Sequence, residues 1–179
     1  MKVSIYMGMS LDGFVARLDD SLDFLGSPAE GEAAGPDGFG AFLATVDALV
    51  MGRRTFEVVH AFGPEGWPYG ELPLHVLSRS LSEVPNGIRP TVQLAQGEPA
   101  EVIQNLEASG VRHVYVDGAA TARAFLEAGL ITDVVLTFVP VLIGTGISLW
   151  GKLSKDIVLE LVETRVLAGG LVQLRYRLR

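Results

Sequence analysis

Two adjacent arginines stand at an abrupt change of pattern in the segment VMGRRTF, residues 50–56. The apolar run before Gly52 is typical of a buried strand, and the residues from Thr55 onward follow helical spacing. The first turn of a helix exposes unpaired backbone N–H groups and the positive end of the helix dipole, and a neighbouring arginine adds a bidentate clamp for phosphate. The pattern is equally compatible with a phosphate site and with two arginines that only solvate a helix end.

Two further turns carry similar chemistry. In VLSRS, residues 76–80, a strand runs into hydroxyl and guanidinium donors that suit an anion. In VYVDGAATARAF, residues 114–125, a strand meets Asp117 and Gly118, and the small residues that follow let a ligand approach a helix N-terminus closely. Singly, each is more simply an ordinary turn. Together the three turns favour one long ligand with several phosphates, because ligands of open α/β sheets bind at the carboxyl ends of the strands.

Other chemistry is poorly supported by the sequence. IGTGISL, residues 143–149, has Leu149 where a dinucleotide fingerprint needs its third glycine, so we expect a turn. The three histidines lack metal-ligand spacing, and we expect no metal. With no cysteine, the chain forms no disulfide, thiolate nucleophile or cysteine–zinc site.

Composition fits one globular domain spanning residues 1–179. The net charge of −7 argues against general binding to nucleic acid or anionic membrane. Residues 134–150 carry no charge, but Pro140, Gly144 and Gly146 would weaken a membrane helix. We therefore expect a buried strand and turn there, in a cytoplasmic protein.

Apolar runs and helical spacing alternate along the chain. Strands are expected at residues 2–7, 47–52, 74–78, 91–95, 112–118 and 133–144, with a C-terminal hairpin of 157–166 and 171–178. Helices are expected near residues 39–46, 55–62, 102–106 and 122–126, and residues 26–40 form a long loop. This order predicts an α/β fold with a mostly parallel sheet and an antiparallel C-terminal edge.

The segments SLDGFVA, DALVMGRRTFE, HVLSRS and VYVDGAATARAFLEAGLITDVVLTFVPVLIGTG, in this order and spacing, resemble the dihydrofolate reductase superfamily. The most similar branch is the RibD C-terminal reductase-type proteins, which are related to the riboflavin-pathway reductase. The resemblance covers residues 2–179. It implies a dihydrofolate reductase-like central sheet with helices on both faces and NADPH across the strand ends.

The resemblance also implies where NADPH is held. The loop over the nicotinamide corresponds to Asp12 through Val15, with Gly8 nearby. The helix start that binds the adenosine phosphates corresponds to Gly52, Arg53, Arg54 and Thr55, and the turn for the 2′-phosphate and adenine side to Ser78 and Arg79. The pyrophosphate turn corresponds to Asp117, Gly118, Ala119, Ala120 and Thr121. Within this set, Arg53 is the expected reader of the 2′-phosphate.

Three departures from folate reductases concern the substrate and the pyrophosphate turn. No Pro–Trp pair occurs between residues 18 and 39, and Asp117 and Ala119 occupy positions that are usually glycine. The resemblance nevertheless implies a cis peptide bond between Asp117 and Gly118, with Gly118→Ala reducing NADPH affinity more than folding stability. Asp37 is the expected proton donor or substrate anchor, with Thr137 as its neighbour, although a helix N-cap explains Asp37 equally well.

The resulting hypothesis is an NADPH-dependent reductase of a C=N or similar bond in a small heterocycle, similar to 5-amino-6-(5-phosphoribosylamino)uracil reductase. A true dihydrofolate reductase and a non-catalytic NADP(H)-binding protein are the alternatives. Related reductases often pair, and we expect a homodimer that binds neither nucleic acid nor membrane.

Overall fold

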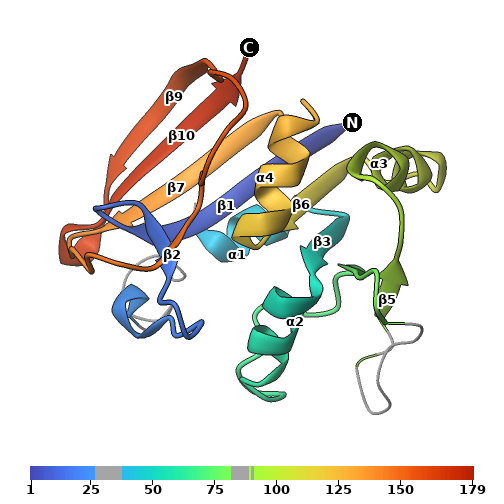
Figure 1. Ribbon diagram of the computed structural model, residues 1–179, viewed down its shortest axis with the longest axis horizontal. Coiled ribbons are helices and arrows are strands. Elements are labelled where there is room, and N and C mark those ends of the chain that lie inside the picture. The colour runs from blue at the N-terminus through green and yellow to red at the C-terminus, as the bar shows by residue number, and fades with distance from the viewer. Residues whose placement is uncertain (27–37, 82–88, 90) are drawn as a thin grey trace.

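The computed structural model describes residues 1–26, 38–81, 89 and 91–179 (Figure 1). The strands are β1 (Lys2–Ser10), β2 (Phe14–Ala16), β3 (Ala48–Gly52), β4 (Leu74–Leu77), β5 (Val92–Ala95), β6 (His113–Asp117), β7 (Asp133–Val139), β8 (Ile147–Ser148), β9 (Leu159–Val166) and β10 (Val172–Leu178). The helices are α1 (Phe39–Leu43), α2 (Arg53–His60), α3 (Pro99–Ala108) and α4 (Ala119–Glu127), with short 3-10 turns η1 (Asp23–Leu25) and η2 (Ala168–Gly170).

Eight strands form one sheet in the order β5-β4-β3-β6-β1-β7-β10-β9. The pairs from β5 through to β7 are parallel, whereas β10 runs antiparallel to both β7 and β9. A separate two-stranded ribbon joins β2 to β8. The predicted α/β class, the mostly parallel sheet and the antiparallel C-terminal edge are therefore confirmed.

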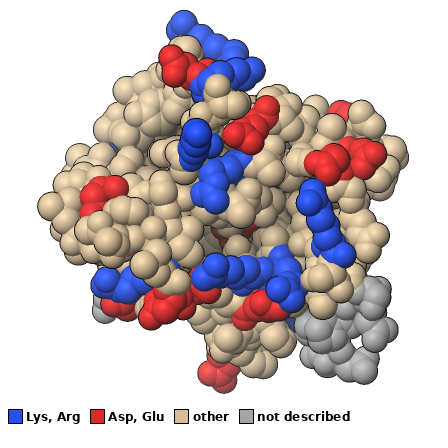
Figure 2. Space-filling view, in the orientation of Figure 1, with Lys and Arg blue, Asp and Glu red and all other residues tan. Residues whose placement is uncertain are grey.

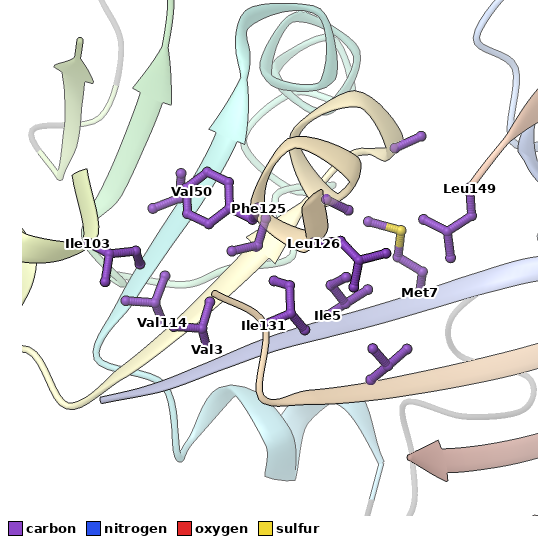
Figure 3. Close-up of a cluster of buried hydrophobic side chains, with 14 of the residues drawn as sticks. Val3, Ile5, Met7, Val50, Ile103, Val114, Phe125, Leu126, Ile131 and Leu149 are labelled. Carbon is purple, nitrogen blue, oxygen red and sulfur yellow. The ribbon is translucent and has the colours of Figure 1, made fainter. Parts of the chain in front are cut away.

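The central strands are buried on both faces, as expected for parallel strands covered by helices. Along β1, Val3 and Ile5 face the cluster formed with α3 and α4, and Tyr6 faces the cluster formed with α2. Figure 3 shows Phe125 and Leu126 of α4 among the side chains of the first cluster. Two apolar cores thus hold α4 and α2 on opposite faces of the sheet, and the first turn of each helix lies at the carboxyl edge of the strands.

The uncharged segment 134–150 forms β7, an irregular turn and β8, as the strand-and-turn interpretation predicted. The strand is shorter than the predicted 133–144, since β7 ends at Val139 immediately before Pro140. Proline has no N–H group for the sheet and restricts the backbone of the residue before it. No helix in the described part of the chain is long and apolar enough to cross a membrane.

Candidate active site

The strand order brings two of the predicted turns into direct contact. Strands β3 and β6 are neighbours and run parallel, so the turns that lead into α2 and α4 leave the same edge of the sheet. A Cβ added to Gly118 would lie only 2.2 Å from Thr55 Oγ1, and one added to Gly52 would lie 3.0 Å from Thr121 Oγ1. Two helix N-termini, each with unpaired N–H groups, therefore stand together.

A cavity of about 730 Å³ opens beside these turns, and Figure 2 shows a hollow bordered by basic and acidic side chains on one face of the molecule. Nine predicted site residues line the cavity: Gly8, Val15, Arg54, Thr55, Asp117, Gly118, Ala119, Ala120 and Thr137. Six others lie outside its lining: Asp12, Gly52, Arg53, Ser78, Arg79 and Thr121. The remaining predicted residue, Asp37, falls outside the described residues.

The predicted arginines all stand beside acidic side chains. Arg54 Nε donates to Asp20 Oδ2 at 2.7 Å, and both residues line the cavity. Arg53 Nε lies 3.7 Å from Glu57 one helical turn away. Arg79, on the next strand end, reaches Glu98 at 3.2 Å and has a side chain that is 93% exposed. Of the three, Arg54 is the one that the fold directs into the cavity.

Ser78 closes its own turn. Its buried hydroxyl oxygen accepts hydrogen bonds from the backbone N–H groups of Ser80 at 3.2 Å and Leu81 at 3.0 Å. This is the local hydroxyl-to-backbone pairing that stabilises serine turns. The Ser78 hydroxyl oxygen therefore stabilises this turn, and its assignment to a ligand stays a prediction.

The Asp117 carboxyl group forms the polar end of the cavity. Its Oδ1 accepts from the Gly118 N–H at 2.7 Å, and its Oδ2 accepts from the Tyr69 hydroxyl at 2.5 Å. Burial raises the pKa of Asp117 above its usual value, although both hydrogen bonds act in the opposite direction. Burial, together with the adjacent carboxyl, also raises the pKa of Tyr69 well above its usual value. Desolvation is therefore the largest influence on the Asp117 carboxyl group, and it acts against the charged form.

The predicted cis peptide bond between Asp117 and Gly118 is wrong: the described residues contain no cis peptide bond. Gly118 instead has φ of 85° and ψ of 134°. Glycine reaches this region at little cost because it lacks a Cβ atom. The Asp117–Gly118 peptide bond is trans, and its N–H group donates to the Asp117 side chain.

Aromatic rings from three elements line the cavity next to Asp117. Tyr6, Tyr69 and Tyr115 are each almost fully buried, and the Tyr115 hydroxyl donates to the Tyr6 carbonyl oxygen at 2.8 Å. The Phe39 ring lies 5.2 Å from the Tyr6 ring and 6.1 Å from the Tyr115 ring. We call Tyr6, Phe39, Tyr69 and Tyr115 the aromatic wall. The sequence analysis missed it, because a tyrosine in a buried strand looks the same whether it faces a core or a cavity.

Thr137, the other predicted catalytic residue, lies beside this wall. Its Oγ1 accepts from Gln173 Nε2 at 3.1 Å, and the same amide donates to the Tyr6 hydroxyl at 3.0 Å. Thr137 is on β7 and Gln173 on β10, directly opposite each other in the antiparallel pair. The antiparallel edge of the sheet thus contributes an ordered polar network to the cavity.

Asp12 has a supporting position. Its Oδ1 accepts from the Ile143 N–H at 3.3 Å and its Oδ2 from the Gly144 N–H at 2.7 Å. A hydrogen bond with Ser10 and these backbone contacts lower the pKa of the Asp12 carboxyl. The residue connects the loop after β1 to the turn before β8 while Val15, three residues later, lines the cavity.

Comparisons with known proteins identify the family and the fold. The RibD C-terminal domain family matches residues 1–173. "Uncharacterized protein YwjB" of Bacillus subtilis (strain 168) is 30% identical over 175 residues, which make up 98% of this chain and 97% of that protein.

Solved structures share the architecture. A putative riboflavin biosynthesis protein from Shewanella sp. PV-4 superposes with a TM-score of 0.90 at 34% identity, covering 100% of this chain and 99% of that one. A diaminohydroxyphosphoribosylaminopyrimidine deaminase/5-amino-6-(5-phosphoribosylamino)uracil reductase from Thermotoga maritima shares the fold, with a TM-score of 0.71 at 13% identity. That match covers 99% of this chain and 56% of that one. The fold is therefore of the dihydrofolate reductase-like type.

Proposed function

The chain belongs to the RibD C-terminal domain family, and from this premise we propose that it is an NADPH-dependent reductase acting on a small heterocyclic substrate. The observation that carries the proposal is the contact between the turns at Gly52 and Gly118, where Gly118 has no room for a side chain and a side chain at Gly52 would be tightly crowded by Thr121. Such turns present backbone N–H groups and two positive helix ends to one anionic ligand.

The residues present suit a dinucleotide with several phosphates. The first turns of α2 and α4 offer N–H groups next to the cavity, and Arg123 of α4 is a basic residue that lines it. A pyrophosphate would lie against Gly118 to Thr121, and the loop carrying Val15 would cover the reactive ring. When bound, NADPH supplies a hydride, and the protein supplies binding and orientation.

The chain's own contribution to chemistry is the polar surface around the aromatic wall. Thr137, oriented by Gln173, and the Asp117 carboxyl both border the cavity. We retain Asp37 as the proposed proton donor or substrate anchor, on the basis of the family resemblance. A carboxyl group in a partly apolar pocket has a raised pKa and can hold the proton that such a reduction needs.

The activity closest to this proposal is that of a 5-amino-6-(5-phosphoribosylamino)uracil reductase, the activity for which the Thermotoga maritima protein is named. A true dihydrofolate reductase and a non-catalytic NADP(H)-binding protein are the two alternatives. Isothermal titration with NADPH and NADH tests the cofactor. Loss of the reduced-nicotinamide absorbance with a panel of pteridines, aminouracils and imines tests turnover. Binding without any turnover would favour the non-catalytic alternative, and failure of NADPH to bind would refute the proposal.

We also propose that the protein forms a homodimer. Strand β9 is the last strand of the sheet, so one of its edges has no partner strand in the described part of the chain. Exposed apolar side chains cluster on β9 and just before it: Val158, Leu161, Val162 and Val166, with 46% to 80% of their surface accessible. An apolar edge strand is a common site of chain association.

A further inference from the structure

We infer that the substrate region of the cavity takes an uncharged, unphosphorylated planar ring, rather than a phosphorylated sugar conjugate. The inference rests on the proposed function in treating the aromatic wall as the place where the substrate binds. It concerns the substrate class, and it follows from the distribution of charge around the cavity.

The wall itself suits a flat ring. All four residues of the wall border the same cavity: Tyr6 is in β1, Phe39 in α1, Tyr69 in the segment that precedes β4, and Tyr115 in β6. Their ring centroids lie 5.2 to 6.5 Å apart in the pairs Tyr6–Phe39, Phe39–Tyr69, Phe39–Tyr115 and Tyr69–Tyr115. Phe39 is the least buried of the four and can pack against a planar ligand, while the three tyrosines are almost fully buried and support its ring. The hydrogen-bonding groups beside them, on Asp117 and Thr137, can recognise ring nitrogens and exocyclic substituents without supplying positive charge.

Basic residues are scarce in this region. All 14 lysines and arginines of the chain are among the described residues, so the charge around the cavity can be counted completely. Arg54 and Arg123 are the two that line the cavity. A substrate phosphate would need at least one of them, because buried or semi-buried phosphates are held by charge-assisted hydrogen bonds.

Neither arginine is available to the aromatic wall. Arg54 is paired with Asp20 at 2.7 Å, and the acidic partner also lines the cavity, so the pair adds no net positive charge. Arg123 belongs to α4, whose buried side chains pack in the core formed with α3, and its guanidinium group donates to the Ser148 carbonyl oxygen at 2.7 Å. The tyrosines of the wall belong to the core on the other face of the sheet, which includes α2. Arg123 therefore lies on the side proposed for the cofactor.

Arg17, which lies close to the cavity residue Phe24, is also paired with a carboxylate. Arg17 donates from Nε to Asp23 Oδ1 at 2.6 Å and from its terminal nitrogen to Oδ2 at 3.1 Å. This bidentate pair stands next to Phe24, which lines the cavity. The helix N-termini could hold a phosphate, but the proposed cofactor already occupies them with its own. Among the described residues, a second phosphorylated ligand would meet no unpaired cation at the wall, because Arg54 and Arg17 are each already paired with a carboxyl group.

Matched ligand pairs test the inference by isothermal titration into protein saturated with NADP⁺. The probes are uridine and its 5′-phosphate, riboflavin and its 5′-phosphate, and 5-amino-6-ribosylaminouracil and its 5′-phosphate. We expect the uncharged member of at least one pair to bind, and to bind at least about tenfold more tightly than its phosphate. Equal or tighter binding of the phosphates, or no binding of any uncharged member, would overturn the inference.

A variant that adds one positive charge to the cavity provides a further test, and an uncharged variant at the same position is its control. Phe62 lines the cavity at the end of α2 and is 48% exposed, so Phe62→Lys can be accommodated without disturbing the core. This variant should improve binding of the phosphates by roughly threefold, the size of an exposed ion pair, whereas Phe62→Leu should not. Repeating the titrations without cofactor separates the proposed NADPH-dependent function from the proposed preference for an uncharged ring. Failure of NADPH to bind would refute the proposed function, whereas the ring preference would still be measurable.

Discussion

Replacing Gly118 with alanine should destabilise the protein even without a cofactor. Two separate effects contribute. The φ of 85° at Gly118 lies where a residue with a Cβ is strained, at about 1–3 kcal/mol. The added methyl would also lie 2.2 Å from Thr55 Oγ1 and 3.1 Å from Thr55 Cβ, and overpacking of this kind costs about 1–3 kcal/mol. Together they predict a loss of roughly 2–6 kcal/mol in the free energy of unfolding.

Two comparisons isolate the steric part. Gly129 also has a positive φ, of 70°, but a Cβ there would meet nothing within 4 Å, so Gly129→Ala shows the cost of a methyl group at a positive φ without crowding. In a Thr55→Ala background the hydroxyl oxygen is absent, so Gly118→Ala should lower the free energy of unfolding by less than it does in the wild-type protein. The coupling between the two substitutions should be about 1 kcal/mol or more, typical for residues in contact.

Urea unfolding of cofactor-free protein, followed by circular dichroism, gives these free energies. At roughly 2–4 °C per kcal/mol for a domain of this size, the lower limit for Gly118→Ala corresponds to a melting temperature at least about 4 °C lower. A loss no greater than that of Gly129→Ala, and unchanged by Thr55→Ala, would refute the packing argument. The sequence predicted that NADPH affinity would suffer more than stability. The contact with Thr55 now makes the stability effect primary.

Three other perturbations and one measurement have defined outcomes. Arg53→Ala should weaken NADPH binding about tenfold or more and leave NADH nearly unchanged, since it removes one charge-assisted contact of roughly 1.5–3 kcal/mol; equal losses would exclude a role at the 2′-phosphate. Burial raises the pKa of Asp117, so at a pH between the unfolded and folded pKa values the folded protein binds a proton that the unfolded chain does not. The free energy of unfolding should therefore fall as the pH rises through this range. Asp117→Asn lacks this titration, so urea unfolding from pH 4 to 8 should show the variant becoming more stable relative to wild type as pH rises, and the opposite slope would contradict a raised pKa. Asp12→Ala removes the acceptor of the Gly144 N–H and should accelerate amide hydrogen exchange there, with no change expected in α3. Light scattering at micromolar concentration should give about twice the 19.1 kDa chain mass, and the chain mass itself would count against the homodimer.

Much of the fold could be predicted because its signals are local. Strand β6, for example, is a run of apolar residues that ends at Asp117 and Gly118, and helical spacing begins directly afterwards. The strand ends carrying Arg54 and Gly118 were predicted for the same reason. Their direct contact was not, because it depends on β3 and β6 being neighbours in the sheet although they are separated by two strands and two helices in the chain.

The cavity could be predicted only in part. Arg53 and Arg54 look equivalent in the sequence, yet one helical step of about 100° directs Arg54 to the cavity and leaves Arg53 outside its lining. The aromatic wall joins residues as far apart as Tyr6 and Tyr115, and no spacing rule connects them. The ion pair between Asp20 and Arg54 is equally non-local. These long-range pairings decide which charges a ligand meets, and they come from the topology rather than from any motif.

Asp117 at the pyrophosphate turn poses a question of charge, because a carboxylate there would repel the very ligand that the turn is proposed to hold. The hydrogen bonds resolve it. The carboxyl group accepts from the Tyr69 hydroxyl and the Gly118 N–H, so its oxygens are directed to protein donors and not to the ligand, and burial raises its pKa. The same contact withdraws the Gly118 N–H from any phosphate, so the proposed pyrophosphate must rely on the N–H groups of the first turn of α4. The turn therefore gives up one donor in exchange for a polar group that faces the aromatic wall. An aspartate in place of the usual glycine connects the proposed cofactor site to the proposed substrate site through a single side chain.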